Sequence, residues 1–213
     1  MPHPTHTDSP TKQPRYRRRK EDRPEEIADA ALHVFSEKGY SATKVEEVAQ
    51  RAGVSKGLLY LYYKTKQDLF KTVVRKHIAP KVDHLLDVVE TSDLPAEEFL
   101  RGPFLHLAKQ IPHTPASILI RLMISEGHKH PDLVAYYWET VVSHGILALK
   151  TIIRRGVASG EFRETAIEKF PQLIASPVIF SVIWNSIFSK QEKLDSDPFI
   201  ETHIDMLIAW LKA

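Results

Sequence analysis

The chain has no cysteine among its 213 residues, which excludes disulfide bonds, thiolate catalysis and cysteine-ligated zinc sites. No stretch approaches the roughly 18 to 20 consecutive apolar residues that a membrane-spanning helix needs. The N-terminus also lacks the apolar segment of a secretory signal peptide. Because a chain without cysteine suits a reducing compartment, we expect a cytoplasmic protein with no membrane partner.

Two further absences concern chemistry and fold. There is no glycine-rich phosphate-binding loop and no metal-ligand spacing, since His128 and His130 are two residues apart and do not share a helical face. We therefore predict no catalytic residue, no metal ion and no cofactor, although His144 or Glu126 could act as the base of an enzyme. Alternating strand patterns and internal repeats are missing too. The sequence predicts an all-α fold of about nine helices.

Residues 43–66 predict two short helices joined by a glycine turn. Thr43 with Glu46 fits a capping box at the start of the first helix. Gly53 gives the turn its backbone freedom, and Ser55 suits the cap of the second helix. That second helix is short and carries several basic and tyrosine side chains: Lys56, Tyr60, Tyr62, Lys64 and Lys66. These features are typical of a helix-turn-helix that binds DNA.

A helix that begins near Pro24 and ends at Gly39 completes a three-helix unit. Apolar residues on the inward faces of the three helices make its core: Ile27, Ala30, Ala31, Val34, Phe35, Val45, Val48, Ala49, Ala52, Leu59 and Tyr63. Tyr60 is either a core aromatic or an outward side chain, and we favour the outward placement because the inward face is already occupied. Residues 24–70 are the predicted DNA-binding domain, and 71–213 the predicted ligand-binding and dimerisation domain.

Residues 1–23 are predicted to be a disordered basic arm. They hold seven Lys or Arg against three Asp or Glu, whereas the whole chain has a net charge of only +2. The arginines of the arm include Arg17, Arg18 and Arg19. A solvated tail is the simpler interpretation. A flexible arm that reaches phosphates or a minor groove is favoured because it directly precedes the helix-turn-helix.

The helix-turn-helix segment carries a family resemblance. It runs from Phe35-Ser-Glu-Lys-Gly39-Tyr40 through Ala42-Thr43-Lys44-Val45 to Ala52-Gly53-Val54-Ser55, and then through residues 56–66 to Asp68-Leu69-Phe70. With glycine, cap and tyrosine at this spacing, residues 27–70 resemble the DNA-binding domain of the tetracycline-repressor (TetR) family. The rest of the chain matches that family in length and helical character, with a weak likeness over residues 126–133.

The resemblance implies a homodimeric transcriptional repressor that binds a double-stranded DNA operator. It implies that Lys56, Tyr60 and Lys66 contact phosphates and that Gly57 allows close approach of the backbone. It also implies a base-facing surface at Leu58, Leu61 and Tyr62, where many members carry polar residues, tyrosine and histidine. We therefore expect thymine methyl contacts and DNA shape to contribute to readout. The predicted DNA-binding residues are Thr43, Lys44, Ser55, Lys56, Gly57, Leu58, Tyr60, Leu61, Tyr62 and Lys66, with Arg17, Arg18 and Arg19 of the arm.

The remaining sequence predicts further helices. One begins near Lys66, and Pro80 is expected either to kink it or to break it. Others are predicted over residues 96–111, 115–129, 131–159, 166–189 and 198–212. A helical bundle of this size can enclose a ligand pocket between its helices. The candidate lining residues are Phe104, Leu107, Met123, Glu126, Tyr137, Trp138, His144, Phe180 and Trp184, which suggest an apolar or amphipathic small-molecule effector of unknown identity.

The last two helices carry more apolar residues than one subunit readily covers, from Ile174 to Phe188 and from Ile204 to Leu211. The resemblance implies that they form a four-helix homodimer interface, with Pro177 kinking the first of them without ending it. We expect effector binding to favour a pose of the helix after Lys66 that no longer matches the operator, with His77 and Pro80 at the pivot. An enzyme, an activator and a helical interaction module that does not bind DNA are the alternatives.

Overall fold

The computed structural model describes residues 15–212, with side chains from Arg23 onward, and these residues form an all-helical fold without strands. Helix α1 spans Arg15–Ala42. The prediction that residues 15–23 are disordered is therefore wrong, and Pro24 lies inside α1 rather than at its start. Arginine, lysine and glutamate are strong helix formers, which accounts for the extension of α1 before the proline. The predictions for residues 1–14 lie outside the described residues.

Helices α1, α2 (Val45–Arg51) and α3 (Lys56–Tyr62) form the predicted three-helix unit. Ile27, Leu59 and Phe35 are at most 1% exposed in its centre. The backbone of Gly39 has φ of +79°, which ends the regular part of α1, and Gly53 has φ of +64° in the turn between α2 and α3. Both predictions for these glycines are confirmed, because a left-handed φ is readily adopted by glycine.

Helices α4 (Lys66–His77) and α5 (Ala79–Thr91) follow as two separate helices. The chain breaks at Ile78, which has φ of −133° and ψ of −42°, and Pro80 occupies the first turn of α5. Of the two alternatives for Pro80, the structure therefore shows the break. The physical reason is that Pro80 has no amide hydrogen to donate to the carbonyl of Lys76, four residues earlier, so α4 cannot continue through it. Proline is well tolerated in the first turn of a new helix.

The second part of the fold is built from α6 (Ala96–Phe99), α7 (Leu105–Gln110), α8 (Ala116–Glu126), α9 (Pro131–Tyr137) and α10 (Ser143–Ala158). A π-helical turn at Leu100–Phe104 joins α6 to α7, and a second one at Trp138–Val142 joins α9 to α10. Pro103 lies in the first of these turns and has no amide hydrogen to donate, which favours the irregular turn. Short 3₁₀ turns cover Ile111–His113, Gly127–Lys129 and Ala166–Glu168.

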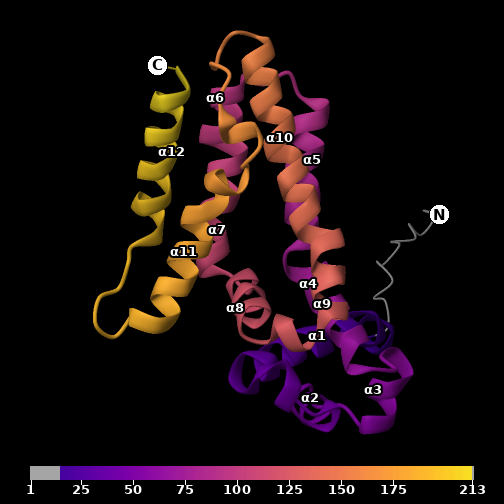
Figure 1. Ribbon diagram of the computed structural model, residues 1–213. Coiled ribbons are helices and arrows are strands. Elements are labelled where there is room, and N and C mark those ends of the chain that lie inside the picture. The colour runs from indigo at the N-terminus through magenta and orange to yellow at the C-terminus, as the bar shows by residue number, and fades with distance from the viewer. Residues whose placement is uncertain (1–14, 213) are drawn as a thin grey trace, which may run out of the picture.

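Helices α11 (Gln172–Phe188) and α12 (Ser196–Lys212) complete the chain. As predicted, Pro177 lies inside α11 without ending it. Figure 1 shows α1–α3 at one end of the molecule and the long helices α5 and α10 standing above them, with α11 and α12 along the opposite side. Helix α8 packs on α1, and α5 packs along α10. Among the described residues, no helix combines the length and the hydropathy needed to cross a membrane.

Candidate DNA-binding face and enclosed cavity

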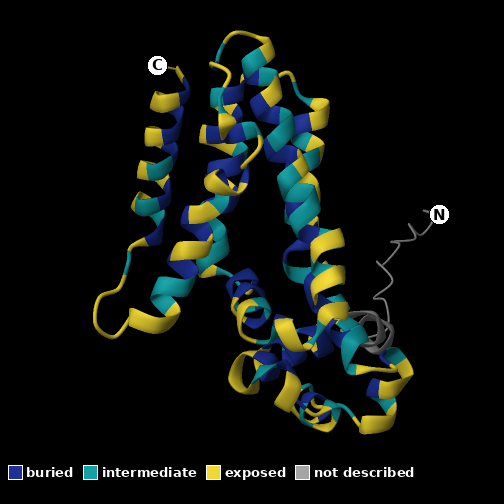
Figure 2. Ribbon diagram, viewed as in Figure 1, coloured by how far each residue is buried: buried dark blue, intermediate teal, exposed yellow. Residues whose placement is uncertain are grey.

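Helix α3 is short, is capped at its N-terminus, and packs on the core through Leu59. The hydroxyl of Ser55 accepts a hydrogen bond from the amide of Leu58 at 3.1 Å, as predicted for a cap. Leu59 is fully buried, and the opposite side carries Tyr60, 40% exposed, and Leu61, 77% exposed. Tyr60 therefore points outward, and a Cβ added at Gly57 would meet open space. Figure 2 shows this exposed side of α3 at the lower edge of the molecule.

Lys56 and Tyr60 lie together on the outer side of α3. The Lys56 ammonium is 5.8 Å from the centre of the Tyr60 ring and forms an ion pair with Glu46 of α2. The hydrogen bond from Lys56 lowers the pKa of Glu46, and the same bond raises the pKa of Lys56. An exposed pair of this kind contributes little to stability because water and salt screen it. Lys56 can therefore exchange Glu46 for a phosphate at small cost.

The structure places Lys66 differently from the prediction. Its ammonium donates hydrogen bonds to the carbonyl oxygens of Tyr40, Ser41 and Thr43, at 2.6, 3.1 and 3.0 Å. Partial burial lowers the pKa of Lys66. The side chain therefore stabilises the carbonyls at the end of α1, and its predicted phosphate contact would require these bonds to break.

Thr43 is also placed inside the protein rather than on its surface. It is 4% exposed, and its hydroxyl donates to the carbonyl of Gly39 at 2.7 Å. The predicted capping box of Thr43 and Glu46 is wrong, because α2 begins one residue later with Lys44 as the cap residue. The carboxylate of Glu47 accepts from the Lys44 amide at 3.2 Å instead. The Lys44 side chain itself is exposed.

The predicted base-facing residues do not form one exposed surface. Leu61 is exposed, whereas Leu58 is half-buried and Tyr62 packs against the core beside Tyr63. Helix α3 packs on the core through Leu59, so the neighbouring side chains on that side of the helix are partly buried too. The side chains of Arg17, Arg18 and Arg19 lie outside the described residues, so the arm remains a prediction.

The second candidate site is a cavity of about 420 Å³ between the helices of the bundle, and it is partly open, since its lining residues Ile124 and Ile179 are exposed. Its wall is almost entirely aliphatic and aromatic. It comes from α5 and α7–α11, together with the two π-helical turns and the 3₁₀ turn at Ile111–His113. The lining residues are Ile78, Val82, Leu85, Phe104, Leu107, Ala108, Ile111, Ile120, Met123, Ile124, Tyr137, Val141, Val142, Gly145, Ile146, Leu149, Pro171, Gln172, Ala175, Val178 and Ile179. Such a wall suits the hydrocarbon part of a ligand.

Four of the nine predicted lining residues contribute to this cavity, namely Phe104, Leu107, Met123 and Tyr137. Five do not. Trp138 is 52% exposed, and the imidazole of His144 pairs with Asp83 at 2.7 Å on the surface. Phe180 and Trp184 stack together on the outer side of α11, and Glu126 turns toward α1. Helix registers decide these directions, and the sequence does not show which face of an apolar helix meets a cavity.

Tyr137 is the one phenol in the cavity wall. Burial raises its pKa to about 12, so the hydroxyl is protonated at neutral pH. The aliphatic residues of α10 and α11 that complete the wall, such as Ile146 and Val178, were absent from the prediction. Their only sequence signal is apolar character, which they share with ordinary core residues.

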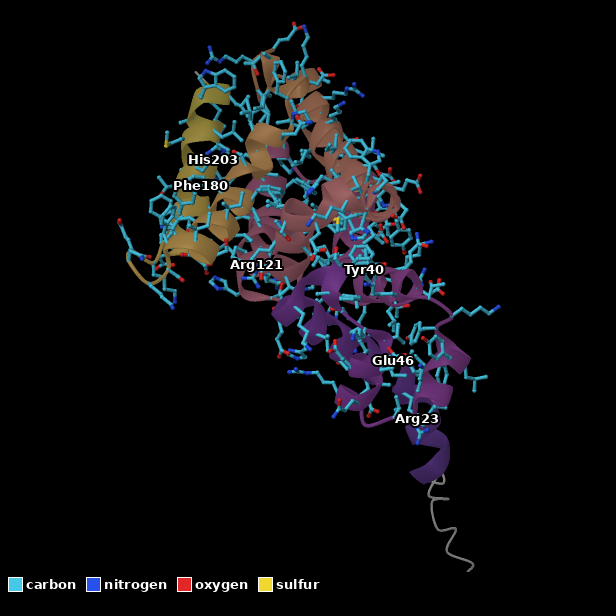
Figure 3. All side chains as sticks on the ribbon, turned by 60° about the horizontal axis from the view of Figure 1, so that its bottom comes forward. Arg23, Tyr40, Glu46, Arg121, Phe180 and His203 are labelled. Carbon is cyan, nitrogen blue, oxygen red and sulfur yellow. The ribbon has the colours of Figure 1, made fainter. Side chains whose placement is uncertain are left out.

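A third feature is the apolar surface of α11 and α12. Many apolar residues named in the prediction, including Ile174, Ile204 and Leu211, are buried within the subunit. Other residues of the two helices remain exposed, and all but Leu173 lie within the predicted stretches: Leu173, Ile179, Phe180, Ile187, Phe188, Met206 and Trp210. Figure 3 shows Phe180 on the side of the molecule that carries α12. Patches of this kind mark interaction sites.

Comparison with known proteins finds a family match for each part of the chain. Residues 27–73 match the family described as bacterial regulatory proteins, tetR family. Residues 105–211, half of the chain, match the family described as AefR-like transcriptional repressor, C-terminal domain. The HTH-type transcriptional repressor KstR2 of Mycolicibacterium smegmatis is 27% identical over 164 residues, which cover 76% of this chain and 78% of that protein.

Solved structures share the fold. The transcriptional regulator FadR from Bacillus subtilis, in complex with stearoyl-CoA, has a TM-score of 0.69 at 20% identity, covering 87% of this chain and 98% of that one. The SmeT–triclosan complex has a TM-score of 0.73 at 19% identity, covering 88% of this chain and 90% of that one. With both parts of the chain matched, the protein belongs to the tetR family of bacterial transcriptional regulators.

Proposed function

We propose that the protein is a repressor that binds a pseudo-palindromic operator as a homodimer and is released from it by a small effector. The observation that carries the proposal is the outward face of α3, where Lys56, Tyr60 and Leu61 stand exposed on a capped helix. Lysine and tyrosine suit phosphate contacts, and an exposed leucine suits a thymine methyl group. Lys44 and Ser55 lie at the starts of α2 and α3, where helix N-termini favour phosphates.

The exposed apolar residues of α11 and α12 support a homodimer. Helix α11 contains no charged residue, its Phe180 and Ile187 are exposed, and Phe180 stacks on Trp184 and on Phe199 of α12. Met206 of α12 is exposed as well. A second copy of the same surface would cover them in an isologous contact. Such a dimer sets two α3 helices at the spacing of successive major grooves, about 34–36 Å.

The effector that fits best is an amphipathic anion with an aliphatic chain. The cavity is lined by hydrocarbon side chains, and a wider groove of about 810 Å³ lies against the same wall, since Leu85 and Leu107 line both. That groove is lined by Lys81, His84 and His106 and by no acidic residue. A chain in the cavity and an anionic head in the groove would satisfy both surfaces. The stearoyl-CoA bound to the related FadR supports this class of effector.

The proposed release is a population shift between two dimer geometries. Ile78 lines the cavity and is also the residue at which α4 and α5 separate. A ligand in contact with Ile78 therefore touches the hinge of α4. His77 and Pro80 flank this hinge, in agreement with the pivot expected from the sequence.

The test is a gel shift with DNA from upstream of the protein's own gene, with and without stearoyl-CoA. We expect salt-sensitive retention that stearoyl-CoA weakens. An Ala175→Phe variant, which fills the cavity, should bind DNA normally and lose the response to stearoyl-CoA. Ala135→Phe on the exposed side of α9 is the matched control. Absence of retention at low salt would reject the repressor, and a promoter reporter that rises with the protein would favour the activator.

A further inference from the structure

A group of hydrogen bonds among Glu126, Ser41 and His130, which we call the polar joint, connects α8 of the cavity wall to the DNA-binding helices. Glu126 is the last residue of α8, and its Oε2 accepts a hydrogen bond from the amide of Ser41 at 2.8 Å and another from the Ser41 hydroxyl. His130 adds its Nε2 at 2.9 Å from the same hydroxyl. Ser41 lies after the Gly39 kink, in the last residues of α1 that lead into α2. We call the segment Gly39–Thr43 the turn, and two residues at and just after the end of α8 hold it.

The absence of a side chain at Gly39 leaves room for the carboxylate of Glu126. Gly39 has φ of +79°, which disfavours any side chain, and a Cβ there would overlap Oε1 of Glu126. Glycine at position 39 therefore serves both the backbone conformation and the approach of Glu126. This second requirement is independent of the helix end that the sequence indicated.

The other side of the turn is held by α4. The Lys66 ammonium binds the carbonyls of Tyr40, Ser41 and Thr43 and lies 4.5 Å from the centre of the Tyr40 ring. The His130 ring packs edge-on against the same tyrosine at 4.7 Å. Figure 3 shows Tyr40 where the DNA-binding helices meet the rest of the molecule. The turn is thus clamped between α8 and α4.

The bond to Glu126 is a charged one. Burial raises the pKa of this carboxyl, but the hydrogen bonds from Ser41, together with the Tyr40 amide and His130, outweigh burial and leave its pKa below the ordinary value. Hydrogen bonds to an ionised acceptor are stronger than neutral ones. The joint therefore resists separation at neutral pH.

The opposite part of α8 faces the cavity through Ile120, Met123 and Ile124. Ile124 is two residues from Glu126 on the same short helix. Because a helix moves largely as a rigid element, a ligand that displaces α8 through these side chains would also displace the carboxylate of Glu126. The displacement reaches the turn that leads directly into α2.

We propose that Glu126 is a positioning residue that ties the Gly39–Thr43 turn to α8 and so passes a shift of the cavity wall to α2 and α3. The proposal rests on the proposed effector-controlled DNA binding for its purpose, while the tie itself is a property of the unliganded protein. This is a second route from the cavity to the DNA-binding helices, through α8 and α1, in addition to the route through Ile78 and α4.

The first experiment needs no ligand. Amide hydrogen exchange is measured on the full-length wild type, on Glu126→Ala and on Glu126→Gln, which keeps an acceptor oxygen without the charge. We expect exchange at residues 40–44 to be about tenfold faster in Glu126→Ala and intermediate in Glu126→Gln, with α10 and α11 unchanged. Glu168→Ala, which removes a surface carboxylate paired with Arg154, is the matched control. Unchanged exchange at the turn, or faster exchange throughout the protein, would overturn the proposal.

The second experiment measures coupling with stearoyl-CoA as the probe. Operator affinity is determined with and without saturating stearoyl-CoA, and stearoyl-CoA affinity is determined separately. We expect Glu126→Ala to reduce the ratio of the two operator affinities at least about fivefold and to leave stearoyl-CoA affinity for the DNA-free protein unchanged. An unchanged ratio would contradict the role of Glu126. If stearoyl-CoA does not change the operator affinity of the wild type, the proposed effector class is wrong. The hydrogen-exchange experiment then decides by itself whether Glu126 holds the turn.

Discussion

Two exposed apolar surfaces of this protein differ in what surrounds them. On α3, Leu61 is 77% exposed beside Lys56 and Tyr60, whereas on α11 and α12 Ile187 is 60% and Met206 67% exposed among other apolar side chains. The first surface mixes one leucine with groups that bind phosphates, and the second gathers hydrocarbon and aromatic rings. The comparison teaches that the neighbours of an exposed apolar residue, rather than its exposure, indicate its partner.

The largest expected effect concerns the α11–α12 surface. The double variant Ile187→Glu with Met206→Glu should convert the homodimer to a monomer, because a second copy would bury the new charges. Operator affinity should fall about a hundredfold or more, since both half-sites are no longer bound together. Sedimentation velocity measures the first result and a gel shift the second. Leu147→Glu, on an exposed position of α10, should leave both unchanged. If the double variant remained a dimer, the α11–α12 surface would not be the homodimer interface, and the prediction would be contradicted.

A smaller effect is expected on α3. Lys56→Ala should weaken operator binding about tenfold and reduce the slope of log affinity against log salt by about one, as for the loss of one phosphate contact. Lys190→Ala, beyond the end of α11, is the control of equal charge. If Lys56→Ala leaves the salt slope at the wild-type value, the ammonium stays with Glu46 in the complex, and the prediction is contradicted.

The smallest effect concerns His77 near the hinge. Burial lowers the pKa of His77, and the nearby Asp29 carboxylate, 3.1 Å away, does not offset it. The Nε2 atom is buried without a well-oriented hydrogen bond. The unfolded chain therefore binds the proton more readily, so stability should decline as the pH falls below about 6.5.

The imidazole of His77 faces Asp29 and lies near the ammonium groups of Lys76 and Lys81, so its titration reports on the α1–α4 packing. His77→Gln should flatten the decline in urea unfolding free energy between pH 7.5 and pH 5.5. An identical decline in both proteins would assign it to other histidines. The variant tests the packing of α4 against α1 and should not alter the homodimer.

The sequence predicted the elements well and the directions of side chains less well. The helix end at Gly39 and the turn at Gly53 followed from local backbone chemistry, and the buried face of α1 followed from periodicity. Thr43 and Lys66 were assigned to the surface because similar positions suggest phosphate contacts. Their hydroxyl and ammonium groups are held by carbonyls at the end of α1, and that arrangement depends on how α4 packs against the turn.

The cavity shows the same limit. Phe104, Leu107, Met123 and Tyr137 were predicted from their size and character, and they line it. Phe180 and Trp184 have the same character and face outward instead. Periodicity gives the apolar face of a helix only when the other faces are polar, and α11 is apolar on most sides.

The sequence by itself determined the all-helical class, the capped α3 and the family, because glycines, caps and apolar periodicity act over a few neighbouring residues. The tertiary structure alone decided which helices enclose the cavity, which apolar residues stay exposed on α11 and α12, and that Glu126 reaches Ser41 across 85 positions of sequence. The physical reason is that contacts between distant segments depend on packing angles and helix register, and local residue preferences do not specify them.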